Sequence, residues 1–216
     1  MHSRPSSPAR QLRSAGYTLV EMLFVVSLMI VLFAVASTGA KKSWQSQELK
    51  ASAIHLAHDL TLASQSAQKL NKPVVVRFYK YFADAIASDQ EHFHAYQLLV
   101  PDTDTPLIAT AQPALKPLFE VQTLEGTTLI SESSRFTSLM TTPQKASPST
   151  DPSLPIGSYE YISIEFRPDG STNLSPDGDP PTITLIPARG ADNMYELPKE
   201  YQTLVLHPES GSVSVY

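Results

Sequence analysis

The chain of 216 residues contains no cysteine. This absence excludes a disulfide-stabilised scaffold, a thiolate metal site and a cysteine nucleophile. It does not select a compartment, because many exported domains lack disulfides. Two catalytic motifs are missing as well: the sequence has no Gly-x-Ser-x-Gly nucleophile elbow and no Walker-type phosphate loop. We therefore expect a protein that is not an enzyme and needs no cofactor.

Basic residues are scarce outside the first sixteen positions. Residues 1–16 carry three of the sixteen Lys and Arg and none of the twenty-one Asp and Glu, which leaves a net charge of about −8 on the remainder. A surface of that sign repels phosphate backbones. Nucleic acid is therefore an unfavourable partner.

One long apolar run stands near the N-terminus, from Tyr17 to Ala36, and Glu21 is its single charge. As a helix, this run would rise about 30 Å, enough to cross the hydrocarbon core of a bilayer. The polar, basic segment precedes the run, which reverses the order of a secretory signal. A plain signal anchor is the alternative, but a carboxylate in such a segment costs roughly 2.5–3.5 kcal/mol and needs a partner.

The segment Ser14-Ala15-Gly16-Tyr17-Thr18-Leu19-Val20-Glu21 resembles the class III signal of type IV pilins and type II secretion pseudopilins. The resemblance implies a leader, 1–16, that a prepilin peptidase removes after Gly16 on the cytoplasmic side. It implies N-methylation of Tyr17, which stands where the family usually has phenylalanine. It also implies that Glu21 pairs with the N-terminal amine of a neighbouring subunit during filament assembly.

Helical periodicity continues beyond the apolar run. Apolar residues alternate spacings of four and three along one helical face, at Leu49, Ala53, Leu56, Leu60, Ala63, Ala67 and Leu70. Asn71-Lys72-Pro73 then predicts the helix end. We expect one helix over Tyr17–Leu70, with a membrane and filament-core part at 17–40 and a continuation at 41–72. A coiled coil is disfavoured, because alanine occupies three of the seven stripe positions.

The pattern beyond Pro73 is that of strands. The expected strands are 74–79, 92–100, 118–124, 159–166, 182–186, 203–207 and 212–216. Turn sequences occur at Arg167-Pro168-Asp169-Gly170 and at Pro208-Glu209-Ser210-Gly211. Strands without intervening helices predict an antiparallel β domain over 73–216. The Ser/Thr/Pro-rich stretch 131–155 predicts an exposed, mobile loop. The expected fold class is α+β.

Three further segments, LKASAIHLAHDLTLASQSAQKLNKPVVVRF, ISIEFRPDGS and LVLHPESGSVSVY, resemble the H-type minor pseudopilins and the FimT-like minor pilins. A looser resemblance is to verrucomicrobial pilin-like cassette proteins. The resemblance implies a pilin-like fold, an inner-membrane anchor and a periplasmic domain. It implies as partners other pilins or pseudopilins, the prepilin peptidase, the assembly platform and membrane lipid. The alternative of a DNA-binding minor pilin is disfavoured, because 207–216 contains no Lys or Arg.

Several polar groups have ligand-type spacing. His92 and His94 would share one strand face, and His55 and His58 lie one helical turn apart, but no third ligand follows from the spacing. A structural or surface role is favoured for both pairs. An oxygen-rich loop offers weak calcium candidates that fit no EF-hand pattern, namely Asp169, Asn173, Asp177 and Asp179.

Overall fold

The computed structural model describes residues 17–82, 90–102, 114–141, 144–146, 159–176, 178–188 and 196–216, with the side chains of 35–43, 141 and 144–146 left out. The chain divides into two compact units, Met1–Lys42 and Ser43–Tyr216. The expected α+β class is confirmed, because one long helix and antiparallel strands make up the described part.

Helix α1 runs over Leu19–Leu70, close to the expected bounds. Thr18 caps its start: the hydroxyl oxygen accepts the Glu21 N–H at 3.3 Å, and the carbonyl oxygen accepts the Met22 N–H at 3.1 Å. Asn71 ends the helix in the left-handed region, with φ 51°. The N–H of Lys72 bonds to the Ala67 carbonyl at 3.3 Å, as in a Schellman motif.

The strands form two antiparallel sheets. The six-stranded sheet has the order β3-β2-β1-β7-β6, with β4 also paired to β2. Its strands are β1 (Val74–Tyr81), β2 (His92–Pro101), β3 (Leu115–Pro117), β4 (Gln122–Thr123), β6 (Gln144–Ala146) and β7 (Tyr159–Phe166). The four-stranded sheet has the order β10-β9-β8-β5. Its strands are β5 (Thr128–Ile130), β8 (Thr182–Pro187), β9 (Gln202–Leu206) and β10 (Val213–Val215).

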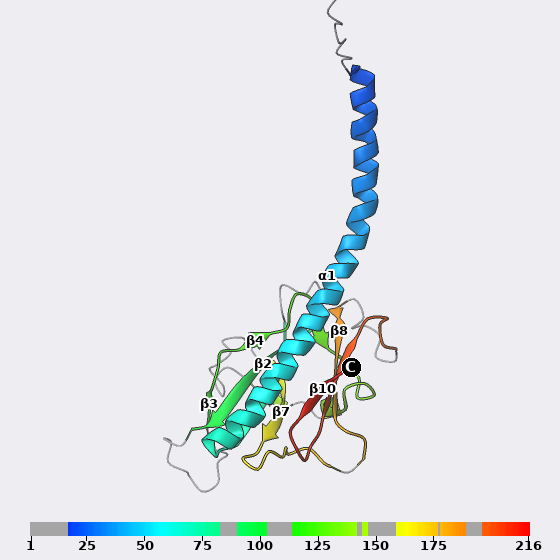
Figure 1. The fold of residues 1–216 in the computed structure, drawn as a ribbon. Helices are drawn as coiled ribbons and strands as arrows, with labels where there is room; N and C mark the ends of the chain where they lie inside the picture. Colours follow the sequence, from blue (N-terminus) through cyan, green and yellow to red (C-terminus); the bar gives the residue numbers. More distant parts are fainter. Residues whose placement is uncertain are drawn as a thin grey trace, which may run out of the picture. The chain divides into compact units, whose positions relative to one another are not determined.

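The C-terminal part of α1 covers the core of the second unit. In Figure 1 it lies over the strands, with β2 and β3 on one side of it and β8 and β10 on the other. The predicted stripe is buried at six of its seven positions, whereas Leu70 is 44% exposed. These six residues share one apolar cluster with side chains of both sheets, among them Phe78, Phe166 and Leu204. Burial of this face is therefore what joins the two sheets.

The expected strand 118–124 is wrong in its bounds, because two short strands replace it. β3 ends at Pro117 and β4 begins at Gln122, and both pair with β2. Between them the side-chain amide of Gln97 donates to the carbonyl of Phe119 at 3.1 Å. A side chain thus supplies a bond that a continuous ladder would supply through the backbone.

The first part of the expected loop at 131–155 is not an exposed loop. Ser131, Ser133 and Thr137 are buried, and a 3₁₀ turn, η1, follows at Ser138–Thr141. The N–H of Thr184 donates to the Thr137 hydroxyl at 3.1 Å, and the Thr184 hydroxyl donates to the carbonyl of Phe136 at 2.6 Å. These short polar side chains fix the segment to β8. Residues 147–155 lie outside the described residues.

Both predicted turns contain a glycine with positive φ, 90° at Gly170 and 62° at Gly211. A Cβ atom at Gly211 would lie 2.6 Å from the carbonyl oxygen of Gly170 and 2.9 Å from the hydroxyl of Ser64 on α1. Gly211 is therefore required for two reasons: its left-handed backbone and the close approach of the turn to its neighbours.

We predict that Gly211→Ala lowers the unfolding free energy more than Gly178→Ala. Gly178 has φ 96°, but a Cβ atom there would meet nothing within 4 Å. Both alanines incur backbone strain of roughly 1–2 kcal/mol, and only Ala at position 211 adds steric overlap. Thermal unfolding followed by circular dichroism measures the difference. Equal destabilisation by the two substitutions would show that the close approach at Gly211 contributes nothing.

Candidate functional site

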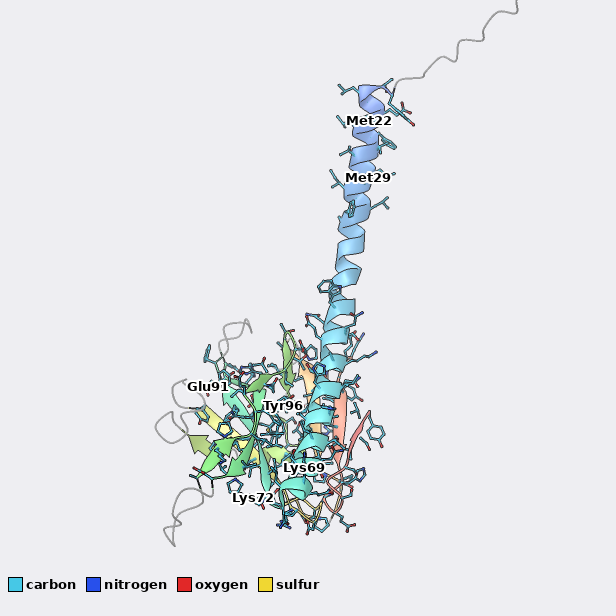
Figure 2. All side chains as sticks on the ribbon, turned by 60° about the vertical axis from the view of Figure 1, so that its left-hand side comes forward. Met22, Met29, Lys69, Lys72, Glu91 and Tyr96 are labelled. Atoms are coloured by element: carbon cyan, nitrogen blue, oxygen red, sulfur yellow. The ribbon has the colours of Figure 1, made fainter. Side chains whose placement is uncertain are left out.

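The N-terminal part of α1 has an apolar surface on every side. Between positions 17 and 33, fourteen large apolar side chains are 40–80% exposed. They are Tyr17, Leu19, Val20, Met22, Leu23, Phe24, Val25, Val26, Leu28, Met29, Ile30, Val31, Leu32 and Phe33. Figure 2 shows Met22 and Met29 standing out from this part of the helix. A helix that is apolar all round is stable only when lipid or other protein covers it.

Glu21 lies in the first turn of α1, inside this apolar surface, and is exposed. Its carboxylate stands at the positive end of the helix dipole, which favours a negative charge. Thr18 and Glu21 also have the Thr-x-x-Glu spacing of a capping box, and the Thr18 half of that box is formed. The sequence analysis explained Glu21 by filament assembly alone. It missed the capping role of Thr18, although the Thr-x-x-Glu spacing is visible in the sequence.

Of the other two residues of the predicted processing site, the structure describes only one. Tyr17 is 73% exposed, directly before the N-cap, and Gly16 lies outside the described residues. The expected membrane segment, 17–40, ends in residues whose side chains also lie outside the described ones. Among the residues that the structure describes, no helix is both long enough and apolar enough to cross a membrane.

Two of the four calcium candidates, Asp169 and Asn173, accept backbone hydrogen bonds within the fold. The Asp169 carboxylate accepts the backbone N–H of Ser171 at 2.9 Å and its hydroxyl at 2.7 Å. These hydrogen bonds hold the pKa of Asp169 below its usual range. The side-chain oxygen of Asn173 accepts the N–H of Glu165 at 3.0 Å. Asp179 is exposed, and Asp177 lies outside the described residues.

His92 and His94 are buried, and both make structural contacts. Nδ1 of His92 lies 3.4 Å from Glu132, which also forms an ion pair with Lys80. Nδ1 of His94 bonds to the carbonyl of His92 at 2.8 Å, and its ring lies 4.2 Å from the ring of Tyr81. Within the described part of the chain, no group of three His, Cys, Asp or Glu side chains is arranged to hold a metal ion.

The other histidine pair lines an open cleft in the second unit. His55 and His58 lie there beside the carboxylates of Glu125 and Asp59. The hydroxyl of Tyr96 donates to Asp59 at 2.7 Å and ties β2 to α1. Figure 2 labels Tyr96 beside the helix. Burial, followed by this hydrogen bond and the nearby carboxylates, raises the pKa of Tyr96 far above its usual value.

Comparison with solved structures finds a distant likeness. A search of solved structures finds the type IV minor pilin FimU of Pseudomonas aeruginosa strain PAO1, at a TM-score of 0.38 and 11% identity, covering 79% of this chain and 89% of that one. No protein-family model matches the chain. No curated protein matches it either. A likeness at this level assigns neither a family nor an activity.

We predict that acid destabilises the second unit in part through His94. Burial lowers the pKa of His94, so the native state binds its proton less readily than the unfolded state does. The contribution of His94 to stability is then fully present above the usual histidine pKa of about 6.5. It declines as the pH falls below that value towards the lower pKa of the native state. Urea unfolding at pH 7 and pH 5 should show a smaller loss of stability for His94→Gln than for the unmodified chain. Equal losses would contradict this assignment.

Proposed function

We propose that the chain is a minor pilin-like or pseudopilin-like subunit and not an enzyme. A prepilin peptidase cuts the precursor after Gly16 and methylates Tyr17. The apolar helix holds the subunit in the inner membrane, with the β domain in the periplasm. An assembly platform then moves it into a filament with other pilins or pseudopilins, either a type II secretion pseudopilus or a type IV pilus-like fibre.

The observation that carries this proposal is the apolar surface of the helix over 17–33. Full burial of each such side chain is worth about 1.5–3 kcal/mol, so fourteen exposed ones impose a strong requirement for cover. Lipid meets the requirement while the subunit is stored. Helices of neighbouring subunits meet it in a filament core. A signal anchor would need only the first of these two states.

Glu21 is the feature that distinguishes a filament subunit from a plain signal anchor. In a core formed by apolar helices, a carboxylate is costly unless an opposite charge lies next to it. Cleavage after Gly16 creates an ammonium group on Tyr17, four residues before Glu21. That ammonium group, supplied by a neighbouring subunit, is the partner we assign to Glu21. The capping geometry at Thr18 supports this role, because it fixes Glu21 in the first turn.

The test compares two substitutions at the start of α1. Glu21→Gln keeps the size of the side chain but removes its charge, and Thr18→Ala removes the cap at a cost of about 1 kcal/mol. If Glu21 pairs with an amine, Glu21→Gln should weaken assembly by about 3–5 kcal/mol, because it leaves that amine unpaired. Thr18→Ala should assemble almost normally. The measurement is the fraction of subunit recovered in purified filaments, with cleavage of both variants as the control.

Two results would contradict this role. Normal recovery of Glu21→Gln in filaments would remove the pairing role. Equal loss for both variants would mean that the effect comes from a weakened helix start and not from pairing with an amine.

A further inference from the structure

The cleft beside His55 and His58 has no part in the proposed function. Its volume is about 250 Å³, and it opens between α1, β2, β4 and the turn after β4, all within the second unit. Two imidazoles and two carboxylates line it, from His55, His58, Asp59 and Glu125. This is a concentration of metal-ligating groups outside the N-terminal site.

The two imidazoles come from residues one turn apart on α1. A separation of three residues puts them about 4.5 Å apart along the helix axis, with Cβ atoms roughly 5–6 Å apart on one face. Their side chains are 65% and 75% exposed, so solvent reaches both rings. Two nitrogens from one helical turn can approach the same ion at the usual Zn–N length of about 2.0–2.1 Å.

Each imidazole also has a carboxylate at the same ring nitrogen. Nδ1 of His55 lies 3.6 Å from Oε1 of Glu125, and Nδ1 of His58 lies 3.4 Å from Oδ1 of Asp59. In metal sites, a carboxylate beside one ring nitrogen orients the imidazole while the other nitrogen binds the ion. Ligating histidines in metalloproteins almost always have such a partner.

The Asp59 carboxylate and the backbone of Glu125 are held by contacts from elsewhere in the fold. The Tyr96 hydroxyl donates to Oδ2 of Asp59, which leaves Oδ1 directed at His58. The backbone N–H of Glu125 donates to the hydroxyl of Ser52 on α1 at 2.8 Å, which fixes the turn that carries this carboxylate. The Asp59 carboxylate and the turn that carries Glu125 are therefore positioned by residues far apart in the sequence.

From this geometry we propose that His55 and His58 bind a late first-row divalent ion, of which Zn²⁺ is the probe. Imidazole nitrogen suits Zn²⁺, Ni²⁺ and Cu²⁺, whereas Ca²⁺ and Mg²⁺ prefer an all-oxygen shell. Because the described residues offer no group of three such ligands, the protein supplies two nitrogens and water completes the coordination. Glu125 is a positioning residue that acts through His55.

The first experiment is calorimetric titration of the full-length protein with Zn²⁺. We expect one ion per chain, and at least about a tenfold loss of affinity in the double variant His55→Gln/His58→Gln. His207→Gln is the matched control, because His207 is an exposed histidine in another part of the unit. Unchanged Zn²⁺ affinity in the double variant, or the absence of binding in the unmodified protein, would overturn the proposal.

The second experiment separates ligation from simple attraction to two carboxylates. Electron paramagnetic resonance of the Cu²⁺-loaded protein should show coupling to two imidazole nitrogens, and the double variant should lose it. Glu125→Gln should retain two-nitrogen coupling while Zn²⁺ affinity falls by about tenfold or more, with an unchanged melting temperature in the absence of metal. Tighter binding of Ca²⁺ than of Zn²⁺ would identify a carboxylate site instead and would contradict the proposal.

Both experiments are independent of the filament proposal. Processing and assembly depend on residues of the first unit, whereas the metal ligands all lie in the second. A failed titration would leave the role of Glu21 intact, and a failed assembly test would leave the metal site intact.

Discussion

Close approach of the C-terminal part of α1 to the sheets is the constraint on which the second unit depends. Ala53, Ala63 and Ala67 are fully buried in its contact face, and small side chains there let the helix backbone lie near the strands. Turns approach the helix equally closely. A Cβ atom at Gly126 would lie 2.2 Å from the Glu48 carboxylate, and one at Gly211 would lie 2.9 Å from the Ser64 hydroxyl. Larger residues at the alanine positions would overpack the core, and a side chain at Gly211 would overlap the backbone carbonyl of Gly170.

The same helix presents two kinds of surface along its length. Its C-terminal part buries one stripe in a core that the chain itself provides, as an ordinary amphipathic helix does. Its N-terminal part exposes apolar side chains on every side over 17–33 and carries Glu21 among them. The chain thus satisfies one part of the helix internally, whereas the other part depends on cover from outside. This difference is the physical basis for proposing a subunit of an assembly.

Much of the fold could be predicted because its strongest signals are local. The helix face and the Asn71 cap follow from periodicity and turn chemistry, and both are confirmed. β5 was missed, because its three residues are too short to show a period and are strands only through pairing with β8. The packing of 131–140 was missed for a similar reason: its Ser and Thr are typical of loops, but they bond to Thr184 across the fold.

The candidate site was predictable only where a residue was unusual for its surroundings. Glu21 stood out because a charge interrupts an apolar run, whereas His55 and His58 acquire their carboxylate neighbours only in the folded chain. The most direct test of the central claim, that this is a processed filament subunit, is the intact mass of the protein expressed with and without a prepilin peptidase. We predict peptidase-dependent loss of 1–16 and one methyl group on Tyr17. An identical, uncut mass under both conditions would contradict it.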